Sequence, residues 1–244
     1  VMMHPLDSAR GMLTPEDVEA AVRPRSAHAP RSRLLVVEQT ANLAGGAVWP
    51  KEQLRAVVDH ARNLGLKTHL DGARLLNAQV ASGVPASDYA AGFDSAWIAF
   101  TKGLGCPVGA VLAGSRSFIE DAWLIKRRWG GAMRQTGVLT AMCLYALDHH
   151  VDRLADDHRL AQYIAGHLQS VPTVKRVHPV ETNIVLVDLD ETSPDARETA
   201  RLLREKDVTV TVVGKRRLRI VTHLDVGQSD ADALVAAMKA LTAE

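Results

Sequence analysis

The sequence predicts an α/β fold built on a mainly parallel sheet with helices on both faces. Short apolar runs typical of strands alternate with longer stretches typical of helices. The short runs are continuously apolar, as in strands of a parallel sheet that is buried on both sides. The chain has 244 residues, of which 47% are hydrophobic, and this is ample for a buried core.

The first half of the chain is predicted to hold four strands with helices between them. Thr14 is a typical helix cap, and proline and two acids follow it, so a helix is expected to run to about Val22. Gly65 is expected to end a second helix. The predicted strands are 33–38, 67–70, 94–100 and 108–113, and the predicted helices are 14–22, 50–63, one from about residue 73, and 117–129.

The second half is predicted to form a smaller α+β unit. After Gly130 and Gly131 a helical pattern of leucines continues without a break as far as Leu160. We place a domain boundary near residue 150, which gives a large domain at 1–150 and a C-terminal domain at 151–244. The later predicted strands are 182–189, 208–213 and 217–222, and the later helices are 194–205 and 230–241, the last capped by Ser229.

Composition argues against several classes of partner. Lys plus Arg total 29 and Asp plus Glu total 28, so net charge does not favour nucleic acid or an anionic membrane. No apolar stretch is long enough to span a membrane, and the N-terminus lacks the pattern of a secretory signal, so we expect a cytoplasmic protein. Cys106 and Cys143 are too few for a disulfide framework or a zinc site and are expected to be unpaired thiols. No metal site is expected.

Lys102 and Asp71 are the residues that point to chemistry. Each ends an apolar run and is followed by glycine, and they are 31 residues apart, which leaves room for one helix and one strand. Two parallel strands would deliver both side chains to one edge of a sheet. An amine that forms an imine and a carboxylate that holds a pyridinium nitrogen are what an enzyme dependent on pyridoxal 5'-phosphate (PLP) supplies. Taken singly, each is also compatible with an ordinary turn.

Two arginines are candidates for binding a carboxylate. Arg74 follows Asp71 by about one helical turn, although a solvated helix cation is an equal alternative. Arg219 shares a strand face with Arg217 and Val221 by the alternation of side chains along a strand. An inward guanidinium needs an acceptor, which is either a carboxylate of the protein or one of the substrate.

Several segments, distributed from end to end of the chain, carry a family pattern. They are residues 37–42 with Gly45, Gly46 and Pro50, residues 69–78, 101–109, 130–137, 157–158 and 182–183, and residues 219–225. In these segments the chain resembles the threonine aldolases of the aromatic amino acid β-eliminating lyase family, which have the fold type I architecture of PLP enzymes. The order and spacing of the motifs make this resemblance specific.

The resemblance implies a homodimeric or homotetrameric lyase that cleaves L-threonine or L-allo-threonine to glycine and acetaldehyde. It implies that Lys102 is the Schiff-base lysine and Asp71 the partner of the pyridinium nitrogen. Arg74 and Arg219 would bind the substrate carboxylate, with Arg74 also near the cofactor. Arg134 would meet the cofactor phosphate from across a subunit interface. His28 matches a histidine near the substrate side chain and is a candidate base, with an exposed loop histidine as the alternative.

Some positions depart from the family pattern. Ala41 stands where the family has a histidine, and Cys106 where a small residue or threonine is usual. The family also has a further N-terminal segment with a Gly-Thr turn for the cofactor phosphate and a histidine that stacks on the pyridine ring. We therefore expect the chain to be a fragment or to start late, with exposed apolar surface on its sheet, poor solubility and little activity alone.

Two alternatives to aldol cleavage stay open. The same scaffold and cofactor support other reactions, such as β-elimination from an aromatic amino acid or transamination. The second is an inactive fragment that serves only as a partner in assembly.

Overall fold

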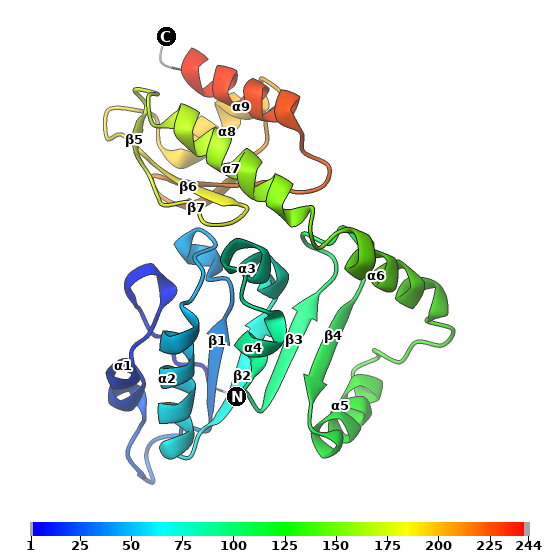
Figure 1. Ribbon diagram of the computed structural model, residues 1–244. Helices are drawn as coiled ribbons and strands as arrows, with labels where there is room; N and C mark the ends of the chain where they lie inside the picture. The colour runs from blue at the N-terminus through cyan, green and yellow to red at the C-terminus, as the bar shows by residue number, and fades with distance from the viewer. Residues whose placement is uncertain (1, 242–244) are drawn as a thin grey trace. The chain divides into compact units, whose positions relative to one another are not determined.

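The computed structural model describes residues 2–241 and divides into two compact units (Figure 1). Among the described residues, the first unit comprises residues 2–41 and 49–151, and the second comprises residues 42–48 and 152–241. The predicted division near residue 150 falls in the break between two helices. The packing of residues 42–48 with the second unit has no local signal in the sequence. A separate role for each domain stays a prediction.

The first unit contains a four-stranded sheet in the order β1-β2-β3-β4. The strands are β1 (Leu34–Glu38), β2 (Lys67–Gly72), β3 (Ser95–Ala99) and β4 (Ala110–Gly114). The first three run parallel and β4 runs antiparallel to β3. The prediction of a mainly parallel sheet is confirmed. Residues 100–109, which connect β3 to β4, are too few for a parallel crossover, and this explains the reversed edge strand.

Helices cover one face of this sheet. Figure 1 shows α2 (Lys51–Asn63) and α4 (Ala86–Ala90) against the sheet, and α1 (Pro15–Ala21) lies beside α2. The cap predicted at Thr14 is present, because its side chain accepts a hydrogen bond from the Asp17 backbone at 3.2 Å. The remaining helices of the first unit are η1 (Ala9–Gly11), α3 (Leu75–Ser82), α5 (Arg116–Arg128) and α6 (Gly137–His149), whereas η2 (Asn42–Ala44) belongs to the second unit.

The opposite face of the sheet is open along β1. Leu35 and Val37 are buried, whereas Leu34 is 55% exposed and Val36 is 52% exposed. All five residues of β4 are exposed as well. The expectation of a sheet buried on both faces is therefore wrong for these two strands of the described chain. Burial alternates along β1 because its side chains point alternately to the covered and the open face.

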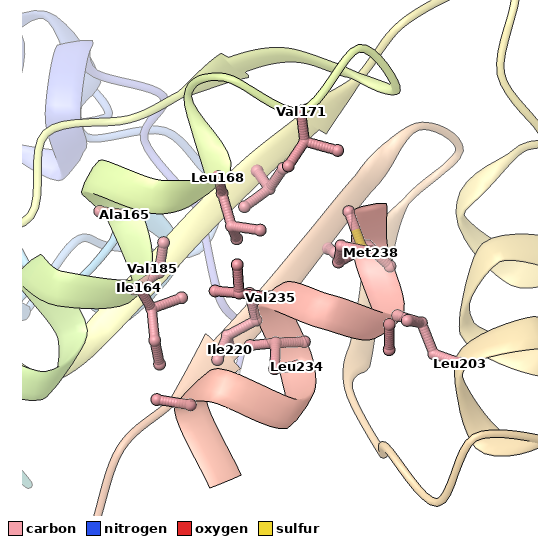
Figure 2. Close-up of a cluster of buried hydrophobic side chains, with 14 of the residues drawn as sticks. Ile164, Ala165, Leu168, Val171, Val185, Leu203, Ile220, Leu234, Val235 and Met238 are labelled. Atoms are coloured by element: carbon pink, nitrogen blue, oxygen red, sulfur yellow. The ribbon is translucent and has the colours of Figure 1, made fainter. Parts of the chain in front are cut away.

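The second unit is an antiparallel sheet with helices on one side. The strands are β5 (Val174–Val177), β6 (Ile184–Leu189), β7 (Thr211–Gly214) and β8 (Arg217–Val221), in the order β5-β6-β8-β7. The helices are α7 (Leu154–Leu168), α8 (Ala196–Arg204) and α9 (Gln228–Ala240). Figure 2 shows the core between them, where Leu168, Ile220 and Val235 lie together.

Two local predictions were wrong, and two short elements were missed. The helix expected to continue to Leu160 is interrupted between α6 and α7, where the His150 ring nitrogen Nδ1 hydrogen-bonds the Leu104 carbonyl at 2.7 Å. The last helix begins after Gly227 instead of Ser229, and Asp230 accepts the Gly227 N–H at 2.8 Å. The short elements α4 and β5 were not predicted, because neither carries a distinctive apolar pattern.

His158 lies on α7 and is only 6% exposed, and its burial lowers the pKa of the imidazole to about 4. The unfolded chain would bind this proton near pH 6.5, so the folded state loses stability as pH falls below that value. We expect the free energy of unfolding to drop by about 2 kcal/mol between pH 7 and pH 5 from this group. Burial raises the pKa of neighbouring Asp157. Protonation of Asp157 therefore favours the folded state at lower pH, which opposes the effect of His158.

Urea unfolding at pH 7, 6 and 5 tests this expectation. His158→Gln should make the free energy of unfolding depend less on pH, whatever the effect of the substitution on stability at pH 7. His149 is exposed, and His149→Gln should leave the slope as in the parent chain. An unchanged slope in His158→Gln would assign the pH dependence to other groups.

Candidate active site

Asp71 lies near the C-terminal end of β2 and is half-buried. Its Oδ1 accepts the Ala73 backbone N–H at 3.1 Å. No hydrogen bond among residues 2–241 reaches Oδ2. One oxygen of the carboxylate is thus fixed by the turn that follows the strand, and the other is available to a ligand.

Trp97 connects Asp71 to Lys102. The parallel register of β2 and β3 pairs Asp71 with Trp97, so their side chains leave the same face of the sheet. The Lys102 Nζ lies 5.5 Å from the centroid of the Trp97 ring, within the range of a cation–π interaction. Lys102 and Asp71 are therefore at one edge and on one face of the sheet. The indole of Trp97 lies beside Asp71 on the neighbouring strand, and the Lys102 amine lies over the indole.

The turn that carries Lys102 is fixed by its backbone. The Gly105 N–H donates to the Lys102 carbonyl at 2.9 Å, and the Cys106 N–H donates to the Phe100 carbonyl at 2.9 Å. Gly105 has φ +68, in the left-handed region that glycine adopts without strain. Glycine after the lysine thus allows the chain to reverse sharply from β3 toward β4 while the lysine side chain stays exposed.

His69 lies on the same strand face as Asp71, two residues earlier. Its ring nitrogen Nδ1 hydrogen-bonds the Ser95 hydroxyl at 2.7 Å. Burial lowers the pKa of His69, and the negative charge of Asp71 partly opposes that shift. The imidazole therefore favours its neutral form and is held by serine, so it does not compete with a ligand for the free oxygen of Asp71.

The other candidates of the first unit are more scattered. Arg74 is half-buried and is the residue that precedes α3, where its carbonyl accepts the Ala78 N–H at 3.2 Å. His28 lies in an exposed loop and Arg134 in the exposed segment between α5 and α6. Within residues 2–241, no hydrogen bond or ion pair joins His28 or Arg134 to Asp71 or Lys102. Their roles stay predictions.

Arg219 belongs to the second unit and is presented by β8 on the sheet face away from the helices. Its strand neighbours Leu218 and Ile220 are in the core, and Arg217 pairs with Asp188 on the same face as Arg219. Arg219 Nη1 donates to Asn42 Oδ1 at 2.9 Å, but its buried Nε has no hydrogen-bond partner among the described residues. A guanidinium with an unused buried donor is suited to a carboxylate ligand.

Sequence analysis missed Trp97 and Asn42. Trp97 carries no motif of its own, but its place opposite Asp71 follows once β2 and β3 are paired in parallel register. Asn42 lies 177 residues before Arg219, and no local pattern predicts that contact.

Comparison with known proteins identifies relatives along the whole chain. The chain is 38% identical over 224 residues to low-specificity L-threonine aldolase 1 of Arabidopsis thaliana, covering 90% of this chain and 63% of the relative. It is 35% identical to the low specificity L-threonine aldolase of Escherichia coli strain K12, covering 100% of this chain and 71% of the relative. The chain thus spans less than two thirds of the length of the plant protein.

A solved structure shows the same fold. The threonine aldolase of Leishmania major superposes with a TM-score of 0.78 at 21% identity, over 95% of this chain and 68% of that protein. The predicted α/β fold with a small C-terminal sheet is therefore confirmed. The model of the family described as beta-eliminating lyase matches residues 1–192. Given that match and the identity to the bacterial relative over the full chain, the chain belongs to the beta-eliminating lyase family.

Proposed function

We propose that the protein containing this chain is a PLP-dependent lyase that cleaves the Cα–Cβ bond of L-threonine or L-allo-threonine to give glycine and an aldehyde, acetaldehyde. The observation that carries the proposal is the pairing of Asp71 with Trp97 and the position of the Lys102 amine over the same indole. The names of the relatives support the substrate class, because those proteins are low-specificity L-threonine aldolases.

The residues of the first unit fit this cofactor. PLP needs an amine for its aldehyde carbon and an ionised carboxylate for its ring nitrogen, and it then acts as a sink for the electrons of a breaking bond to Cα. Lys102 Nζ would hold the aldehyde carbon, and the free Oδ2 of Asp71 would keep a proton on the ring nitrogen. The indole of Trp97 lies on one side of the amine. Arg134 is proposed to bind the phosphate.

Other side chains are proposed to bind and orient the substrate. Arg74 and Arg219 would bind its carboxylate, and the unpartnered Nε of Arg219 supports a bidentate contact. Such a contact fixes the amino acid so that one bond to Cα, here the bond to Cβ, is the bond that breaks. His28, or a water molecule that it holds, would accept the proton of the β-hydroxyl oxygen.

The setting of this reaction is also a proposal. The protein would be cytoplasmic and would act as a homodimer or homotetramer. No helix among residues 2–241 is long and apolar enough to cross a membrane.

Attachment of PLP to the chain can be tested without turnover. The protein containing this chain is incubated with PLP, reduced with borohydride and digested with trypsin. We expect the label on Lys102, because the turn presents its amine beside Asp71. Trypsin does not cleave at a modified lysine, so the label should appear in residues 75–116. Lys102→Ala should abolish it, whereas a label on Lys51, Lys67 or Lys126 would contradict the proposal.

The reaction class is tested by a substrate panel. Release of acetaldehyde from L-threonine and L-allo-threonine, coupled to oxidation of NADH, is expected from a protein that holds PLP on Lys102. Release of ammonia from tyrosine would instead indicate β-elimination, and amino transfer to 2-oxo acids would indicate transamination. Labelling of Lys102 without any turnover in the panel would favour the inactive fragment.

A further inference from the structure

The two cysteines of the chain lie together in the first unit, although they are 37 positions apart in the sequence. Cys106 belongs to the turn after β3 and Cys143 to α6. The Cys106 thiol donates to the Met142 carbonyl at 3.6 Å, and the Cys143 thiol donates to the Val108 carbonyl at 3.9 Å. Each sulfur therefore faces the backbone beside the other cysteine.

Packing holds the two segments in this position. Cys106 is buried with Phe100, Leu104 and Ala146, and Cys143 packs against the same cluster. The contact between His150 and the Leu104 carbonyl fixes the C-terminal end of α6 to the turn. Gly109 leaves space for the second sulfur, because a Cβ at that position would lie 3.2 Å from Cys143 Sγ. The sulfurs are thus brought together by tertiary structure.

The two thiols differ in access to solvent. Cys106 is 8% exposed, whereas Cys143 is half-buried. Burial, together with the neighbouring Cys143 thiol, raises the pKa of Cys106. A soluble oxidant therefore reaches Cys143 first, and Cys106 is placed to react with whatever forms there.

We propose that Cys106 and Cys143 form a modification site that small disulfides oxidise to an intramolecular disulfide bond. The Cys143 thiolate attacks one sulfur of the small disulfide and releases one small thiol. Cys106 then loses its proton and attacks the Cys143 sulfur, and the second small thiol leaves. Two protein thiols are oxidised, one small disulfide is reduced to two thiols, and the protons pass to the leaving sulfurs.

The bond would join the turn that carries Lys102 to α6. Cys106 closes that turn through its hydrogen bond to Phe100, so a link to Cys143 would restrain the backbone around the lysine. No group of three or more metal-binding side chains exists among the described residues, so the thiol pair has no further ligand for a metal ion. This inference rests on packing within the first unit and is independent of the proposed lyase reaction.

The test uses the reduced 244-residue chain with oxidised glutathione under native conditions and, in parallel, in urea. Free thiols are blocked with N-ethylmaleimide and the chain is digested without reduction. We expect a linked pair of tryptic peptides, residues 103–116 with residues 135–153, with no glutathione retained. The native chain should form it on the order of tenfold faster than the unfolded chain, because folding packs the two cysteines against the same cluster.

Two variants separate the steps. Cys106→Ser should stop at the mixed disulfide of Cys143 with glutathione, because the resolving thiol is gone. Cys143→Ser should leave Cys106 largely unmodified in the native state, because Cys106 is buried. The proposal is overturned if the native parent chain retains glutathione on Cys143, links through cysteine to a second chain, or reacts no faster than in urea.

Discussion

In the protein containing this chain, replacing Asp71 with asparagine is expected to lower kcat/KM for cleavage of L-threonine by about 10³-fold. Asparagine has nearly the same shape, and its amide oxygen can still accept the Ala73 N–H that fixes the turn. It has no negative charge at the position of Oδ2, so a pyridine nitrogen there would lose its proton. The loss should fall mainly on kcat, since the amine of Lys102 is unchanged.

Acetaldehyde release, measured alongside borohydride labelling of Lys102, tests this expectation. Labelling should persist in Asp71→Asn while turnover falls. Asp88 on α4 is a matched control. Its Oδ2 lies 2.6 Å from the Nζ of Lys51, and it has no place in the proposed site. Asp88→Asn should keep parental kcat/KM. Cleavage by Asp71→Asn within tenfold of the parent would remove Asp71 from the proposed role.

Gly46→Ala is expected to destabilise the second unit by about 3–5 kcal/mol. Gly46 has φ +71, which is unfavourable for alanine. A Cβ at this position would lie 2.2 Å from Thr182 Oγ1. Thr182 is fully buried and donates that hydroxyl to the Gly46 carbonyl at 2.8 Å, so moving it away would leave a buried hydroxyl without its acceptor.

Gly45 provides the matched control in the same segment. Its φ is +81, but the atom nearest to an added Cβ is Leu186 Cδ1 at 3.5 Å, an ordinary contact. Gly45→Ala should therefore cost only about 1–2 kcal/mol, from the backbone alone. Urea unfolding followed by circular dichroism compares the two variants. Equal losses would mean that Thr182 moves freely and that the buried contact contributes little.

The parts of the fold that were predicted correctly have local causes. β1 is an apolar run, α1 begins at the Thr14 cap, and α2 follows Pro50 and ends before Gly65. The break between α6 and α7 was missed because both helices continue the same spacing of leucines. What ends α6 is a contact from His150 to the turn at Leu104, 46 residues earlier, which no window of sequence contains.

The candidate site divides in the same way. Lys102 and Asp71 were identified because each combines a strand end with a glycine, and the parallel pairing of β2 with β3 is the simplest link between them. The indole under the amine depends on how the lysine side chain folds back, which spacing alone does not determine. The hydrogen bond from Arg219 to Asn42 depends on a segment from the other half of the chain.

Residues 42–48 have a consequence for the order in which the protein assembles. They are synthesised early, yet the Thr182 hydroxyl that binds Gly46 is made 136 residues later. Until β6 is made, the segment has no partner sheet. In the absence of the segment, Ile184 and Leu186 of β6 would have no cover. Contacts of such long separation slow folding. A polypeptide that started at residue 151 would lack this cover altogether, so the second unit would not assemble on its own as it does within the longer chain.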